Sequence, residues 1–174
     1  AALFARHGLA LDFRVCDALS PLGTTAYATR AYVGEVEVPR GVQLVGPARP
    51  LRPRQDAPAF PFERLRPDRP LIYASFGSQI SHQPVALRRL AAACAQLGVQ
   101  WVFNVGPELA SQASEFEGEG LGVAVAFAPQ LELLARASVL VTHCGANSVM
   151  EALAAGVPML GTPVCNDQPL QARF

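Results

Sequence analysis

From residue 71 onward, short apolar runs alternate with segments in which apolar residues recur at helical spacing. The runs predict strands over residues 71–76, 99–105, 122–127, 139–142 and 159–162. The segments between them predict three helices. The first begins at Pro84 and ends at Gly98, the second lies around residues 131–135, and the third ends at Gly156. Nearly continuous apolar strands separated by helices are typical of a parallel sheet. The predicted fold class is therefore α/β, with a parallel sheet that has helices on both faces.

The first 70 residues are less regular. Residues 1–45 mix short apolar segments with turn signals, and within them residues 25–38 alternate loosely enough to predict a strand. Residues 46–70 hold seven of the fifteen prolines and six arginines. Because proline fixes φ and removes a backbone donor, we expect this segment to be an extended linker with solvated arginines, not a packed element.

Composition narrows the classes of function. With 174 residues, 51% of them hydrophobic, the chain can form one domain, or one domain and part of another. All 14 basic residues are arginine and balance 14 acidic ones, so the net charge of zero argues against a nucleic-acid binder. The absence of lysine excludes Schiff-base chemistry and a lysine-bearing phosphate loop.

Charge is distributed unevenly along the chain. Residues 1–70 carry ten arginines and seven acids (+3), whereas residues 71–174 carry four arginines and seven acids (−3). If the second part binds an anion, it must do so with backbone dipoles and neutral donors.

Targeting signals and cysteines indicate the cellular setting. No run reaches the roughly 18 apolar residues of a membrane span, and no signal-peptide pattern opens the chain. The last residues resemble the opening of a helix, so we expect a piece of a longer protein. The four cysteines form no C-x-x-C pair, which favours a reducing cytoplasm.

Polar and glycine residues follow four of the predicted strands. They are Gly77-Ser78, then residues 128–130, then residues 143–148 with Glu151 one turn on, and then residues 166–168. Because ligands of open parallel sheets bind outside the carboxyl ends of the strands, these loops predict a single site.

The loop of residues 143–148 is the most informative of the four. Gly145 lets a ligand approach the backbone, and the helix that starts at Asn147 and Ser148 attracts a phosphate through its N–H groups and dipole. Bland alternatives stay open at this point. Asn147 and Ser148 are also ordinary helix-start residues, His143 can be a core histidine bonded to a backbone carbonyl, and Glu151 can simply favour the dipole.

The longer pattern resembles a known family. Phe127-Ala128-Pro129-Gln130, His143-Cys144-Gly145-Ala146-Asn147-Ser148, Glu151, Gly156-Val157-Pro158, Pro163 and Asp167-Gln168 together resemble the donor-binding signature of UDP-dependent glycosyltransferases. Residues 73–78 resemble the first strand and loop of that family's C-terminal domain, and residues 45–47 the run into its interdomain linker. The bacterial branch that glycosylates macrolides, carotenoids and other lipophilic acceptors is the most similar.

This resemblance implies a GT-B architecture of two Rossmann-like domains. Residues 1–45 would be the tail of the N-terminal acceptor domain, residues 46–70 the interdomain linker, and residues 71–174 most of the donor-binding domain, incomplete at its C-terminus. The implied enzyme is an inverting hexosyltransferase that moves a hexose, expected to be glucose, from a UDP-sugar to a hydroxyl of a small lipophilic acceptor such as a macrolide, carotenoid, sterol or phenolic. It would be cytoplasmic, or peripheral to the membrane where the acceptor is lipophilic.

The resemblance also assigns roles by position. Phe127 would lie against the uracil ring, the Ala128 backbone would bond its edge, and Gln130 and Glu151 would hold the ribose. Ser78, His143, Gly145, Asn147 and Ser148 would surround the diphosphate, and Asp167 and Gln168 would bind sugar hydroxyls. No cofactor and no metal are expected.

The sequence departs from the family pattern at several points. Plant members have tryptophan where Phe127 and Ala146 stand, and the segment between Gln130 and His143 is about two residues shorter here. The family's general base is a histidine near the start of the N-terminal domain. His7 lacks that strand context and His82 is expected to be polar surface, so the chain alone is expected to be inactive.

Three other functions are compatible with parts of this pattern. A non-catalytic nucleotide-sugar-binding subunit that needs a separate acceptor-binding partner has the same donor site. The Asp167-Gln168 pair argues against a GT-B epimerase. A zinc site built from His143, Cys144 and Cys165 lacks the paired spacing of known zinc ligands.

Overall fold

The computed structural model describes residues 6–8, 22–48, 59–78 and 81–174. Its internal contacts divide the chain into two units, Ala1–Gly46 and Pro47–Phe174, which are described separately. Most of the predicted N-terminal tail (residues 1–5 and 9–21) and the middle of the proline-rich segment (residues 49–58) lie outside the described residues.

The first unit contains a small parallel pair of strands, β1 (Thr24–Ala26) and β2 (Val42–Leu44), joined through the one-turn helix α2 (Arg30–Val33). The strand predicted over residues 25–38 is therefore wrong beyond Ala26. Thr29 ends the extended backbone because its hydroxyl accepts a hydrogen bond from the Tyr32 N–H (3.1 Å) and caps the helix.

The second unit is built on a five-stranded parallel sheet in the order β5-β4-β3-β6-β7. The strands are β3 (Leu71–Ser75), β4 (Gln100–Asn104), β5 (Gly122–Val125), β6 (Val139–Thr142) and β7 (Met159–Gly161). Each lies within its predicted run, and the α/β fold class is confirmed.

The helices between the strands begin and end largely where the sequence predicts. α3 (Pro84–Leu97) has proline in its first turn and ends at Gly98, whose φ of 65° is left-handed. α4 (Gln130–Leu134), α5 (Ala146–Ala155) and α6 (Gln168–Gln171) follow. The 3₁₀ helix η2 (Pro107–Phe116) was not predicted, because its two buried residues, Leu109 and Phe116, lie far apart among polar ones.

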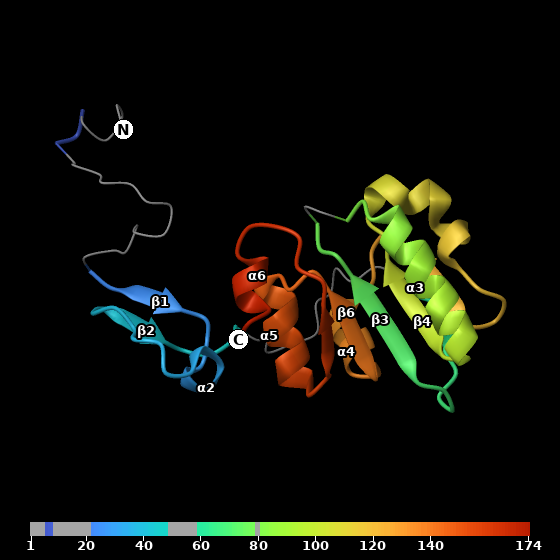
Figure 1. Cartoon of the computed structure of the whole chain (residues 1–174), viewed down its shortest axis with the longest axis horizontal. Coiled ribbons are helices and arrows are strands. Elements are labelled where there is room, and N and C mark those ends of the chain that lie inside the picture. Colours follow the sequence, from blue (N-terminus) through green and yellow to red (C-terminus); the bar gives the residue numbers. More distant parts are fainter. Residues whose placement is uncertain (1–5, 9–21, 49–58, 79–80) are drawn as a thin grey trace. The chain divides into compact units, whose positions relative to one another are not determined.

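Side chains of the strands alternate between two cores, one on each face of the sheet. Figure 1 shows the strands and the helices that connect them. Ala74 of β3 packs with buried residues of α3 and η2 in one core, and Tyr73 packs with Leu133 of α4 and Ala152 of α5 in the other. Both faces of the sheet are therefore covered, as nearly continuous apolar strands require.

The end of the proline-rich segment is packed, contrary to the prediction. η1 (Phe62–Arg64) follows Phe60, and Phe60 and Phe62 pack against the second core. The Arg136 guanidinium lies 4.5 Å from the centre of the Phe62 ring. Proline restricts φ locally but does not prevent neighbouring aromatic side chains from being buried, so composition alone was misleading for residues 59–70.

The strand order creates a natural place for a ligand. From β3 the chain moves outward to β4 and β5, then returns to form β6 on the other side of β3. The direction of winding therefore reverses between β3 and β6. Loops that leave the carboxyl ends of these two strands diverge and leave a crevice there.

Candidate functional site

A cleft of about 740 Å³ opens at the carboxyl edge of the sheet. Seven of the predicted donor-binding residues line it, namely Ser78, Phe127, Ala128, Gln130, Asn147, Ser148 and Glu151. They come from the loop after β3, the segment from the end of β5 into α4, and the first turns of α5. The end of β4 and the segment after it add Asn104, Gly106 and Pro107, which were not predicted.

Gln130 is the centre of a hydrogen-bond network in this cleft. Its amide nitrogen donates to a carboxylate oxygen of Glu151 (2.5 Å) and to the hydroxyl of Ser148 (3.3 Å). Its amide oxygen accepts a hydrogen bond from the hydroxyl of Tyr73 (3.2 Å). The predicted Gln130–Glu151 pair is thus already assembled by contacts between β3, α4 and α5.

The start of α5 offers backbone donors. Cys144 adopts a left-handed φ of 65°, and Gly145 is the N-cap of the helix, without a side-chain hydrogen bond to the first turn. N–H groups at the start of a ten-residue helix without a side-chain cap carry partial positive charge and favour an anion. Asn147 is exposed there and Ser148 is buried, and both line the cleft.

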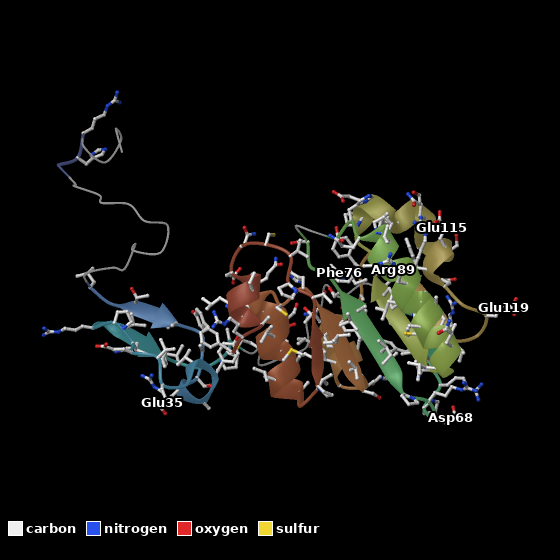
Figure 2. The ribbon with its side chains drawn as sticks, in the orientation of Figure 1. Glu35, Asp68, Phe76, Arg89, Glu115 and Glu119 are labelled. Atoms are coloured by element: carbon white, nitrogen blue, oxygen red, sulfur yellow. The ribbon has the colours of Figure 1, made fainter. Side chains whose placement is uncertain are left out.

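His143 fills the space between two glycines. A Cβ atom on Gly77 would lie 2.7 Å from Nε2 of His143, and one on Gly145 would lie 2.5 Å from the same atom. The turn that holds Gly77 leaves β3 just after Phe76, which is labelled in Figure 2 and is 4% exposed in the core. Burial lowers the pKa of His143, with weaker opposing effects from the Ser75 backbone and the Asp167 carboxylate.

Phe127 presents an aromatic ring beside the cleft. Its side chain is 61% exposed, although most large apolar residues of the sheet are buried. An exposed ring on the rim of a pocket can stack on a planar base. Ala128 follows it and lines the same cleft, so its backbone lies close to where such a base would sit.

The other four predicted residues, His143, Gly145, Asp167 and Gln168, are not among those that line the cleft. Gln168 is only 5% exposed, and its amide oxygen accepts hydrogen bonds from the backbone N–H groups of Val164 (2.9 Å) and Cys165 (3.0 Å). Asp167 is exposed and accepts a hydrogen bond from Gln171 (3.3 Å). Contact of Asp167 and Gln168 with a sugar stays a prediction. The side-chain oxygen of Gln168 holds the backbone of its own loop.

A family model described as UDP-glucoronosyl and UDP-glucosyl transferase matches residues 55–174. The chain belongs to this family of UDP-glycosyltransferases. Its fold is the Rossmann-like C-terminal domain of the GT-B architecture.

Individual relatives agree with this assignment. UDP-glycosyltransferase 74C1 of Arabidopsis thaliana is 35% identical over 116 residues, which are 63% of this chain and 25% of the relative. The solved glycotransferase of kitacinnamycin matches with a TM-score of 0.71 and 25% identity, over 88% of this chain and 39% of that one. A solved UDP-glucose: anthocyanidin 3-O-glucosyltransferase in complex with UDP matches with a TM-score of 0.53 and 34% identity, over 59% and 24%. The chain spans about a quarter of the length of the curated relatives it matches.

Sequence reasoning missed several polar residues in and beside the cleft of this UDP-glycosyltransferase domain, among them Tyr73 and Asn104. Tyr73 lies within the apolar run of β3, and its hydroxyl reaches the network at Gln130. Asn104 ends β4 and donates a hydrogen bond to the Ser75 hydroxyl (3.3 Å) on the floor of the cleft. A polar side chain at or near the carboxyl end of an otherwise apolar strand was the available signal for both.

Within the described part of the chain, no group of three or more histidine, cysteine, aspartate or glutamate side chains is placed to hold a metal ion. His143, Cys144 and Cys165 therefore form no such group, and Cys94, Cys144 and Cys165 are free thiols. Among the same described residues, none of the helices has the length and apolar character needed to span a bilayer.

Proposed function

We propose that this chain is the donor-binding half of an inverting glycosyltransferase that moves a hexose, glucose in the first instance, from a UDP-sugar to a hydroxyl of a small lipophilic acceptor. One observation carries the proposal. A single cleft combines the start of α5, which has no side-chain cap, with a preassembled Gln130–Glu151 pair.

Each part of UDP has a complementary group in or beside this cleft. The uracil would stack on Phe127, and the ribose hydroxyls would donate to the Glu151 carboxylate. The diphosphate would lie at the start of α5 with Asn147, Ser148 and Ser78, near His143 and Gly145. Neutral donors and a helix terminus suit a half of the chain that carries −3 and has no lysine.

The same donors give the site its role in transfer. As the glycosidic bond breaks, negative charge develops on the departing diphosphate, and donors already directed at it stabilise that charge. The acceptor hydroxyl would attack the anomeric carbon from the opposite side, with its proton taken by a base outside these residues. A metal is not needed for this scheme.

Named relatives support the acceptor class. One structural neighbour is a UDP-glucose: anthocyanidin 3-O-glucosyltransferase, whose name gives a small organic acceptor, and another is the glycotransferase of kitacinnamycin. Acceptor choice would depend mainly on the part of the longer relatives that this chain does not match.

Calorimetric titration of the chain with UDP, dTDP and UDP-glucose tests the proposal, with circular dichroism of the same sample to establish that the chain is folded. We expect saturable binding of UDP that is tighter than that of dTDP. A Glu151→Ala variant should bind UDP about 10- to 100-fold more weakly, since it loses charge-assisted hydrogen bonds to the ribose. A folded chain that binds none of the three ligands would contradict the proposal.

Glu119→Ala is the matched control for that variant. Glu119 is exposed, lies in the loop before β5 and does not line the cleft (Figure 2). Like Glu151→Ala, the Glu119→Ala variant removes one negative charge, but it does so away from the cleft. Its UDP affinity should therefore equal that of the unmodified chain. An equal loss in both variants would mean that net charge, and not a ribose contact, governs binding.

A further inference from the structure

Tyr73 is a fully buried residue whose hydroxyl contacts Gln130, one of the residues that line the donor cleft. It is the middle residue of β3, the central strand of the sheet, and its exposed fraction is 0%. Its ring packs in the second core among apolar side chains of β3, β4, α4 and α5. Its hydroxyl nonetheless donates to the amide oxygen of Gln130, 57 residues further along the chain.

The chemistry of the neighbours gives this contact a direction. An ionised carboxylate only accepts hydrogen bonds, so the amide nitrogen of Gln130, not its oxygen, must face Glu151. The amide oxygen then points away from Glu151 and needs a donor of its own. Among the described contacts, the Tyr73 hydroxyl supplies that donor.

Tyr73 can fill this role at any ordinary pH. Burial raises the pKa of its phenol and outweighs the lowering effect of the nearby Ser75 and Asn104 side chains, while the Glu151 charge adds to the rise, so the phenol keeps its proton. A phenol that always carries its hydrogen keeps the Gln130 amide in one orientation. Both amide hydrogens then face α5, toward Glu151 and Ser148.

We infer that Tyr73 is a positioning residue for the nucleotide, which acts through Gln130 to hold the Glu151 carboxylate ready for the two ribose hydroxyls. This inference rests on the proposed function and adds to it a residue that does not itself line the cleft. Without the Tyr73 hydroxyl, the Gln130 oxygen has no donor and the amide cannot turn over, because its nitrogen is needed at Glu151. The pair therefore loosens where the ribose would bind.

The test combines a protein change with a ligand change. Tyr73→Phe removes only the hydroxyl, and it is titrated with UDP and with 2′,3′-dideoxy-UDP, which lacks both ribose hydroxyls. We expect Tyr73→Phe to weaken UDP binding about 3- to 10-fold, the worth of one lost hydrogen bond, and to leave dideoxy-UDP binding unchanged. The control is Tyr27→Phe, whose side chain is 62% exposed in the first unit and whose affinity for both ligands should be unaltered.

Two results would overturn the inference: an equal loss of both ligands, which would indicate a general packing effect, or no loss of either. If the unmodified chain fails to bind UDP, the proposed function fails instead, and that is seen before any variant is made. Should Tyr73→Phe not fold, Gln130→Asn serves in its place. It is too short to reach both Tyr73 and Glu151, and normal UDP affinity for it would equally overturn the inference.

Discussion

The imidazole ring of His143 has room because two residues beside it, Gly77 and Gly145, are glycines. Gly77 and Gly145 approach it so closely that any Cβ on either would collide with the ring. Gly77 also has a φ of +73°, a conformation that other residues adopt only with strain. The two glycines near His143 are therefore needed for packing. His143 can be a packed residue and also lie near the proposed diphosphate, so these two interpretations do not exclude each other.

Burial of His143 makes the stability of the protein depend on pH. Because the folded protein holds the pKa of His143 below its usual 6.5, the unfolded chain takes up the proton first as the pH falls. The contribution of neutral His143 to the stability of the fold is fully present above about pH 6.5 and is lost as the pH falls toward the lowered pKa. We expect the thermal midpoint to fall between about pH 7 and pH 5.5, and to fall less in His143→Gln.

His82→Gln is the comparison for this measurement. The His82 side chain is 58% exposed, so this variant removes one imidazole from the surface without opening a gap in the core. Identical pH profiles for His143→Gln and the unmodified chain would show that His143 is not the titrating group.

At the scale of elements, α5 combines two functions that are in conflict. A negative charge in the first turn of a helix stabilises the helix, by about 0.3–1 kcal/mol, yet it would repel a diphosphate bound at the same place. Asn147 is exposed in that turn and lines the cleft. A neutral residue here is thus what an anion-binding helix requires.

Asn147→Asp separates the two effects. We expect the unfolding midpoint to rise slightly while UDP binds at least several-fold more weakly and uridine, which has no phosphate, binds as before. Ala155→Asp places the same charge at the other end of α5 and should leave UDP affinity unchanged. A loss of uridine binding as large as that of UDP in Asn147→Asp would argue against a diphosphate at this helix terminus.

The sequence predicted the elements well where local signals were strong. Proline at the start and glycine at the end of α3 mark its bounds, and the apolar runs contain all five strands of the larger sheet. It failed where a local contact decided the outcome, as at Thr29, whose hydroxyl caps a helix turn inside an apparent strand pattern. It failed again at η2, where sparse buried residues hide the helix.

At the scale of the whole molecule, the sequence could not predict which side chains from distant segments contact each other. The loops of the site follow from strand ends and could be predicted locally. The hydroxyl of Tyr73 and the side chain of Gln100 act on residues 57 and up to 34 positions away, and such partners are known only once the chain has folded. The same holds for Asn104, whose place in the cleft depends on the pairing of β4 with β3.

Gln100 joins the packed segment of residues 59–70 to the sheet. It is 4% exposed, accepts a hydrogen bond from the Arg66 N–H (2.8 Å), and donates to the carbonyl oxygens of Arg66 (2.7 Å) and Arg69 (2.8 Å). Gln100→Ala leaves these backbone groups without their partner and should lower the free energy of unfolding by about 1–3 kcal/mol, measured by urea denaturation. Gln96→Ala, at an exposed position of α3, should change it by less than about 0.5 kcal/mol.

UDP affinity should be unchanged in folded Gln100→Ala, because Gln100 lies at the opposite end of β4 from Asn104 and does not line the cleft. Stability equal to that of the unmodified chain would show that residues 66–69 are not held by this side chain.

The single tryptophan gives the molecule an intrinsic optical probe. Trp101 is 2% exposed, its indole N–H donates to the Phe116 carbonyl oxygen (2.8 Å), and it does not line the cleft. Its fluorescence should therefore be emitted at short wavelength in the native state and shift to longer wavelength when water reaches the ring. Nucleotide in the cleft should leave the spectrum of the folded chain nearly unchanged. Emission from this one indole would then follow unfolding separately from ligand occupancy.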